Sequence, residues 1–196
     1  MGQGFVGSAI KEGLKNFHDV LTYDKDPTKS MTVSLEQVVN NSEIIFVCVP
    51  TPMRPSGQCD TRILEDVVYE INEIASKSKS SKKTVVVKST VPPGTTSSLD
   101  EKHSKINVAF SPEFLTEANS FDDFKRQTRI IIGGTGAKKV KQMFRKPFPK
   151  IPIVITKSDT AEMVKYFINC FLATKVTFAN QMYEICEASG IDYDKV

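Results

Sequence analysis

Short apolar runs alternate with longer amphipathic runs along the whole chain. Runs that are apolar at every position, such as Ile-Ile-Phe-Val-Cys-Val at 44–49, are typical of strands buried on both faces. The pattern predicts strands at residues 20–23, 44–49, 84–88, 106–110, 129–132 and 153–155. It therefore indicates a parallel sheet that is covered by helices on both sides.

The amphipathic runs between these strands predict helices. Ser34-Leu-Glu-Gln37 is a capping-box pattern that opens a short helix. Residues 61–76 place their apolar side chains on one stripe, and residues 136–146 form a more basic helix. The last helix, at about 159–188, is long, with Asp159 as the cap of its start and Gly190 at its end. Alternating strands and helices predict a doubly wound α/β domain.

Composition narrows the classes of function. The chain is 40% hydrophobic and 25% charged, which is ordinary for a globular protein. Its net charge of +3 is too small to indicate nucleic-acid binding, and the sequence has neither a membrane-spanning apolar run nor a signal segment. No metal-ligand spacing is present, so we expect no metal site and a cytoplasmic protein whose thiols are reduced: Cys48, Cys59, Cys170 and Cys186.

The first chemical motif is Gly2-Gln-Gly4-Phe5-Val6-Gly7, which is GxGxxG followed by a helical run. Its first glycine allows a tight turn, the second lets the backbone approach a pyrophosphate, and the third lets the helix pack against the sheet. Asp24 follows 17 residues after Gly7, at the end of an apolar run. A carboxylate there can bind both ribose hydroxyls and repels a 2′-phosphate, so the pattern predicts a Rossmann-like domain that binds NAD in preference to NADP.

Four further segments carry a family resemblance. They are Val47-Cys-Val-Pro-Thr-Pro52, Lys88-Ser-Thr-Val-Pro-Pro-Gly-Thr95, Ser111-Pro-Glu-Phe-Leu-Thr-Glu117 and Ala161-Glu-Met-Val-Lys-Tyr-Phe-Ile-Asn169. In this order and spacing they resemble the UDP-glucose/GDP-mannose dehydrogenase family, of the UDP-glucose 6-dehydrogenase type. Proline after the strands fixes the exit paths, which would hold Pro50, Thr51 and Thr90 at the cofactor crevice.

The resemblance implies roles for the third segment. Glu113 would act as an acid/base in a hydrolysis step, with Thr90 helping to hold a water. The backbone around Phe114 and Leu115 would bind the nucleotide sugar, and Glu117 would lie near the nicotinamide end of the cofactor. If residues 112–118 are helical, Glu113 and Glu117 share one face and their carboxylates repel, which favours a functional role over a solvated acidic turn.

The fourth segment places Lys165 and Asn169 one above the other on the long helix. The resemblance implies that both bind substrate and donate hydrogen bonds to a developing oxyanion. The alternative is a snorkelling lysine beside a surface amide. We expect Lys165, Asn169, Thr90 and Glu113 to converge on one side of the crevice.

The resemblance also indicates what this chain lacks. The family oxidises the C6 alcohol of a nucleotide sugar, most simply UDP-glucose, in two hydride transfers to NAD through a cysteine thioester. That cysteine lies in a Gly-Phe-Gly-Gly-x-Cys motif that is absent here. The link from Asp24 to Ile44 is also shorter than is common in the family, which leaves the choice of sugar open.

These features predict the domain organisation. We expect residues 1–157 to form the NAD-binding domain and residues 158–196 to form a helix that begins a central domain. The glycine motif leaves no room for a strand before it, and residues 192–196 resemble the entry to another helix. We therefore expect a fragment or a trimmed gene product that is inactive alone.

Two functional hypotheses from different classes stay open. The first is the cofactor-binding part of an NAD-dependent nucleotide-sugar 6-dehydrogenase of polysaccharide biosynthesis, dimeric through the helix after residue 158. The second is a non-catalytic module that binds NAD or a partner. A third reading, a β-hydroxyacid dehydrogenase, also pairs a glycine motif with a helical lysine and asparagine, but the segments at 88–95 and 111–117 argue against it.

Overall fold

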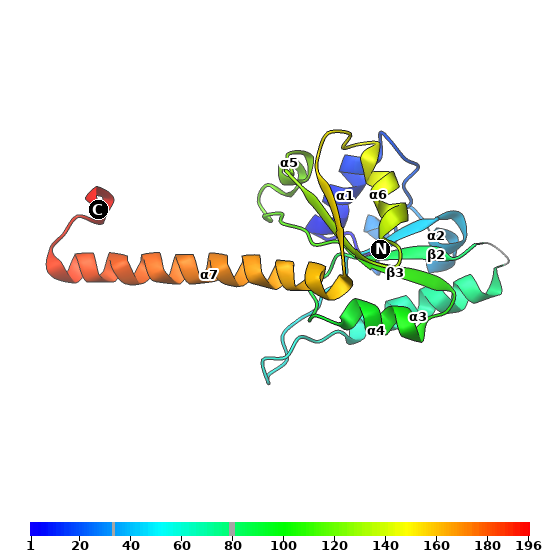
Figure 1. The fold of residues 1–196 in the computed structure, drawn as a ribbon, viewed down its shortest axis with the longest axis horizontal. Coiled ribbons are helices and arrows are strands. Elements are labelled where there is room, and N and C mark those ends of the chain that lie inside the picture. The colour runs from blue at the N-terminus through cyan, green and yellow to red at the C-terminus, as the bar shows by residue number, and fades with distance from the viewer. Residues whose placement is uncertain (33, 79–80) are drawn as a thin grey trace.

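The computed structural model describes residues 1–32, 34–78 and 81–196. Among them a five-stranded sheet runs in the order β1-β2-β3-β4-β5, and Figure 1 labels its strands β2 and β3. The strands are β1 (Ile44–Val47), β2 (Lys83–Val87), β3 (Ile106–Phe110), β4 (Ile130–Gly134) and β5 (Ile153–Thr156). All neighbours are parallel except β3 and β4, which pair antiparallel through two residues each.

Helices surround this sheet, and one of them extends away from it. They are α1 (Phe5–Leu14), α2 (Leu35–Asn41), α3 (Arg62–Lys77), α4 (Thr95–Lys102), α5 (Ser120–Lys125), α6 (Ala137–Arg145) and α7 (Ser158–Ser189), with 3-10 turns at Pro27–Lys29 and Tyr193–Lys195. Ser34 caps α2 by accepting a hydrogen bond from the Gln37 N–H, as predicted. The segments that became α4 and α5 were not predicted, because both are short and weakly patterned.

Alternate residues of β2 enter two separate cores. Val85 and Val87 pack with Leu64, Val68 and other residues of α3 on one face. On the other face, Val86 packs with side chains of α1, α5 and α6. All five residues of β2 are buried, which explains the continuous apolar run in its sequence. The predicted doubly wound α/β fold is therefore confirmed.

One predicted strand is wrong: residues 20–23 adopt no strand. The carbonyl of Thr22 accepts hydrogen bonds from the N–H groups of Met31 and Thr32, and that of Tyr23 accepts one from Gly2. These isolated bonds do not amount to a ladder. Apolar character alone does not make a strand, because a strand also needs a neighbour that pairs with it along several residues.

Helix α7 is 32 residues long and projects from the domain, as Figure 1 shows. Ala161, Glu162 and Lys165 are buried near its start, whereas most large apolar side chains beyond them are exposed. The N-cap is Lys157, so the prediction that Asp159 caps the helix is wrong; Asp159 lies in the first turn and accepts from the Thr160 N–H. Gly190 ends the helix in a left-handed conformation (φ 66°), as predicted.

Candidate active and cofactor site

The glycine motif forms a tight turn that leads into α1. Gly2 has φ 77°, and a Cβ there would lie 2.3 Å from the Cys48 carbonyl oxygen. A Cβ on Gly7 would lie 1.9 Å from the carbonyl oxygen of Gly2, so the start of α1 can pack on the turn only without a side chain. Gly4 is the N-cap of α1 and has nothing within 4 Å of its Cβ position. The backbone at Gly2 and Gly7 is therefore tightly packed, whereas the space at Gly4, beside the N-terminus of α1, is open. A pyrophosphate could approach the helix N-terminus there.

Asp24 is held beside this turn. One carboxylate oxygen accepts from the Gln3 N–H at 2.5 Å, and the other accepts from the Asp26 N–H at 2.9 Å. These hydrogen bonds, from Asp26 first and then from Gln3, hold the pKa of Asp24 below its usual range. The carboxylate also lines a cavity of about 780 Å³. Its remaining lone pairs can accept hydrogen bonds from ribose hydroxyls.

A cavity of about 780 Å³ joins the predicted cofactor residues. Its walls include both apolar side chains from α2 and α3 and polar groups from the loops after β1 and β2. The predicted residues among its lining are Gly2, Gly4, Phe5, Val6, Asp24, Pro50, Thr51, Thr90 and Glu113. An open glycine turn, a carboxylate for ribose and apolar walls for a base fit a dinucleotide, and the group they would hold is NAD.

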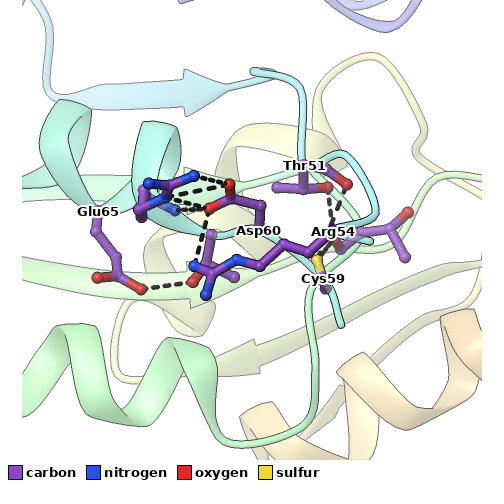
Figure 2. A network of polar contacts seen from close by, with 8 residues as sticks. Thr51, Arg54, Cys59, Asp60 and Glu65 are labelled. Atoms are coloured by element: carbon purple, nitrogen blue, oxygen red, sulfur yellow. Dashed lines mark hydrogen bonds and ion pairs between the residues drawn. The ribbon is translucent and has the colours of Figure 1, made fainter. Parts of the chain in front are cut away.

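A polar network secures the loop that carries Thr51, and Figure 2 shows it from close by. Asp60 accepts hydrogen bonds from Arg62 at 2.8 Å and from Arg54 at 3.1 Å. Hydrogen bonds from the Arg62 guanidinium lower the pKa of Asp60 well below its usual range. The Thr51 hydroxyl donates to the Thr90 carbonyl at 2.7 Å, so the loops after β1 and β2 are fixed against each other.

Lys165 and Glu113 meet, as the sequence predicted. The Lys165 ammonium is 2.8 Å from Oε1 of Glu113 and donates to the Glu113 carbonyl at 2.6 Å. Their side chains are only 7% and 11% exposed. The same ammonium lies 5.6 Å from the centre of the Phe114 ring. An ion pair this well buried costs desolvation, so it need not contribute to the stability of the fold.

Two other predicted site residues lie elsewhere. Asn169 is exposed, and Glu117 lies in an exposed turn; neither lines the cavity of about 780 Å³. The condition for a shared face is not met, because residues 112–118 are not helical and helix α5 begins only at Ser120. Glu113 instead accepts a hydrogen bond from the Leu115 N–H, which favours a local turn over a helix. Glu113 and Glu117 are therefore not stacked on one helical face.

Lys88 is a buried cation whose role the sequence did not indicate. Its ammonium donates to the Pro112 carbonyl at 3.2 Å and lies 3.5 Å from the Ser111 hydroxyl. Burial lowers its pKa to about 8, while Cys48 and Glu113 act in the opposite direction. The signal in the sequence was a lysine at the end of an otherwise apolar strand. Its contacts hold the start of the segment that carries Glu113.

Glu162 was also missed, although it lies within one of the quoted segments. Its side chain is fully buried, and it accepts hydrogen bonds from the N–H groups of Gly94 and Thr96, both at 2.7 Å, and from the Thr96 hydroxyl. Gly94 is the N-cap of α4 and has no side chain to cap that helix. Glu162 therefore caps α4 from α7, and it ties the loop that carries Thr90 to the helix that carries Lys165.

The cysteines offer no cluster. All four are free; Cys186 is buried and Cys170 is exposed. Burial raises the pKa of the Cys48 thiol, and the Cys59 thiol lies 3.6 Å from the Thr90 carbonyl oxygen. In the part of the chain that the structure describes, no three His, Cys, Asp or Glu side chains form a candidate metal site. None of the described helices combines the length and apolarity that a bilayer crossing requires.

Curated proteins and solved structures resemble this chain over most of its length. A putative UDP-glucose 6-dehydrogenase of Bacillus subtilis is 29% identical to this chain over the whole length of the chain. The chain covers 54% of that protein. The UDP-glucose 6-dehydrogenase of Rickettsia felis shares 35% sequence identity with this chain. The matched segment covers 78% of this chain and 35% of the Rickettsia protein. The chain thus spans about a third to a half of these relatives.

The solved structures agree with these relatives. A ternary complex of GDP-mannose dehydrogenase from Pseudomonas aeruginosa matches 99% of the chain and 54% of its own chain, with 28% identity and a TM-score of 0.85. A UDP-glucose dehydrogenase from Pyrobaculum islandicum matches 83% of the chain and 39% of its own, with 33% identity and a TM-score of 0.73.

Family models match two consecutive parts of the sequence. The NAD binding domain of the UDP-glucose/GDP-mannose dehydrogenase family matches residues 20–148, and the central domain of the same family matches residues 159–196. The match to this NAD binding domain identifies NAD as the cofactor of the domain. With the glycine turn, the cavity and both family matches in agreement, the chain belongs to the UDP-glucose/GDP-mannose dehydrogenase family.

Proposed function

We propose that this chain is the cofactor-binding part of an NAD-dependent nucleotide-sugar 6-dehydrogenase that oxidises UDP-glucose to the uronic acid. The observation that carries the proposal is the contact between Lys165 and Glu113 at the edge of the dinucleotide cavity. It brings a hydrogen-bond donor and a carboxylate together where the strands of the sheet end. The relatives named above as UDP-glucose 6-dehydrogenases support the choice of substrate.

The residues of this chain would divide the work as follows. NAD, when bound, accepts hydride from the sugar; the glycine turn and Asp24 orient it. The Lys165 ammonium would donate a hydrogen bond to the oxygen that gains negative charge at C6. The Glu113 carboxylate would take a proton from the water that attacks the acyl intermediate, with Thr90 beside it. Asn169, Phe114, Leu115 and Glu117 would complete the site on the side of the sugar and the nicotinamide.

We further propose that the enzyme is a cytoplasmic homodimer. Its α7 exposes large apolar side chains over much of its length, which suits a partner surface. They include Phe167, Phe171, Leu172, Val176, Phe178 and Ile185. Sedimentation of the chain at rising concentration measures whether it associates through this helix.

Asp24 is expected to select NAD. Calorimetry on the chain should show NAD binding at least about tenfold tighter than NADP, because a 2′-phosphate would meet the carboxylate. Asp24→Asn keeps an acceptor for the Gln3 N–H and removes the charge, so the preference should shrink. Asp26→Asn is the matched control, since Asp26 does not line the cavity. Equal affinities for both cofactors in the unchanged chain would sink the proposed role.

The purified chain is expected not to oxidise UDP-glucose. The thioester mechanism needs a reactive cysteine beside Lys165 and Glu113. The Cys48 thiol is half-buried with a raised pKa, and Cys186 is buried near the far end of α7. The assay follows the absorbance of NADH, with UDP-glucose and NAD in excess. Sustained release of two NADH per sugar would refute this expectation and make Cys59 the first candidate nucleophile.

A further inference from the structure

A second cavity, of about 290 Å³, lies beside the cofactor cavity. Its walls come from α1, α5, α7 and the loops before and after α5, and they include Phe114 and Arg129. Among the described residues, Lys88 and Glu113 alone line both cavities. These two residues therefore form the boundary between the cavities, and the placement of the Glu113 carboxylate decides which cavity it faces.

The segment that carries Glu113 begins where the sheet ends. The Ser111 N–H still donates to the Val87 carbonyl at 3.1 Å, as a continuation of the ladder between β3 and β2. Pro112 has no N–H group, so the ladder cannot continue through it. Within the described part of the chain, no backbone N–H donates to the carbonyl of Pro112 or of Glu113. The backbone around Glu113 therefore depends on side chains for its conformation.

Two buried ammonium groups from different elements bind these two carbonyls. Lys88, at the end of β2, donates to the Pro112 carbonyl at 3.2 Å. Lys165, on α7, donates to the Glu113 carbonyl at 2.6 Å. The two carbonyls belong to the peptide units on either side of the Glu113 α-carbon. Because each peptide unit is planar, holding both carbonyls fixes φ and ψ of Glu113.

The fixed backbone determines where the Glu113 carboxylate lies. Its Oε1 is 2.8 Å from the Lys165 ammonium, and its Oε2 accepts from the Leu115 N–H at 2.7 Å. A rotation of the peptide unit between Pro112 and Glu113 would move the side chain away from both partners. Lys88 makes no hydrogen bond or ion pair to this carboxylate in the part of the chain that the structure describes, so its effect passes through the backbone.

The sheet itself does not require an ammonium at position 88. Val86 lies two residues earlier, on the same face of β2, and packs with apolar side chains of α1, α5 and α6. Lys88 is only 6% exposed, and burial lowers its pKa to about 8. An apolar side chain of similar length would fill this place without the desolvation of a charge. The group that does require a donor here is the Pro112 carbonyl.

We propose that Lys88 is a positioning residue for Glu113. Together with Lys165 it fixes the peptide units on both sides of Glu113, and it thereby holds the carboxylate at the boundary between the two cavities. The importance of this placement for catalysis rests on the proposed function, in which Glu113 takes a proton from the attacking water. The placement itself can be measured on this chain without any turnover.

Nuclear magnetic resonance of the 196-residue chain measures the placement. Lys88→Met keeps much of the length and apolar volume but removes the donor, so the peptide unit before Glu113 can rotate. Hydrogen exchange at the Leu115 amide, which is bonded to Glu113, should then quicken at least about tenfold. The nitrogen resonance of the Lys165 ammonium should also move, because both of its acceptors belong to Glu113. The unfolding temperature should change by less than about 4 °C.

Lys83→Met is the matched control. Lys83 lies at the other end of β2, is also 6% exposed, and also donates to a backbone carbonyl at 3.2 Å, that of Asn40. Its replacement removes the same charge and the same kind of hydrogen bond at the end of the strand away from Glu113. The exchange rate of Leu115 and the resonance of Lys165 should therefore stay as they are in the unchanged chain.

Unchanged exchange at Leu115 in folded Lys88→Met, or equal acceleration in Lys83→Met, would overturn the proposal. If Lys88→Met does not fold, Lys88→Gln takes its place, since the glutamine amide ends one bond short of the ammonium position, and the same acceleration is expected.

A full-length enzyme of the family that carries these residues gives the catalytic readout. Lys88→Met should lower its kcat at least about tenfold, because a misplacement of about 1 Å can cost about 10²-fold in rate. An unchanged kcat beside fast exchange at Leu115 would show that the placement does not serve catalysis and would overturn that part of the proposal. If the unmutated enzyme does not oxidise UDP-glucose, the proposed function fails, whereas the exchange rates at Leu115 still decide whether Lys88 places Glu113.

Discussion

Replacing Glu162 with alanine is expected to lower the free energy of unfolding of this chain by about 3–5 kcal/mol. The fully buried carboxylate accepts three hydrogen bonds, from two N–H groups and one hydroxyl at the start of α4. Alanine leaves these donors buried without an acceptor and opens a cavity at the same place. Because domains are stable by only about 5–15 kcal/mol, much of the stability would be lost.

Urea unfolding followed by circular dichroism measures this loss. Glu162→Gln keeps one carbonyl acceptor, so it should cost less than alanine. Glu184→Ala is the matched control, since Glu184 is an exposed glutamate on the same helix and should change stability by less than about 0.5 kcal/mol. If the two alanine variants unfold at the same urea concentration, the capping of α4 by Glu162 contributes little.

The contrast between Glu162 and the glycine turn shows what a sequence reveals. Gly2, Gly4 and Gly7 act through backbone shape within one turn, and their spacing alone predicts that shape. The contact between Glu162 and Thr96 joins residues 66 positions apart, and no local pattern indicates it. The same holds for Lys88, whose burial follows from the packing of several elements and not from its neighbours.

The strands show the same limit. Apolar runs predicted β1 to β5, although only β2 is buried at every residue and Val154 and Ile155 of β5 are exposed. Residues 20–23 have an equally apolar run, yet they make only isolated hydrogen bonds. Whether an apolar run forms a strand depends on a neighbouring segment that hydrogen-bonds with it along several residues. Residues 112–118 are not helical for a related reason: Asp123 accepts hydrogen bonds from the Thr116 N–H and hydroxyl, which hold that segment in a turn.

The convergence at the candidate site was predicted only in part. The resemblance placed Lys165 with Glu113, and the two side chains do meet at 2.8 Å. Thr90 lines the same cavity as Glu113, whereas Asn169 is exposed on the next turn of α7. Helical spacing puts Asn169 above Lys165 but does not say how far the sheet edge extends along the helix. The roles of all four residues stay predictions.

Lys165 is expected to matter for turnover far more than for cofactor binding. In a full-length enzyme of the family that carries these residues, Lys165→Met should lower kcat by about 10²–10³. Methionine keeps much of the length and apolar volume of the side chain but removes the donor aimed at the developing oxyanion. NAD affinity should change little, because Lys165 does not line the cavity that holds Gly4 and Asp24.

The measurements are kcat from NADH release and the Kd of NAD from calorimetry, on variants whose folding is first checked by thermal unfolding. Lys175→Met is the matched control, since it removes an exposed lysine further along α7. Removal of Lys165 also leaves the Glu113 carboxylate buried without its cation, so some loss of stability is expected and the two effects must be separated. Lys165→Met with Glu113→Gln removes both charges and should regain stability without regaining turnover. A Lys165→Met enzyme that keeps its kcat but loses NAD affinity would show that the lysine serves the cofactor and not the oxyanion.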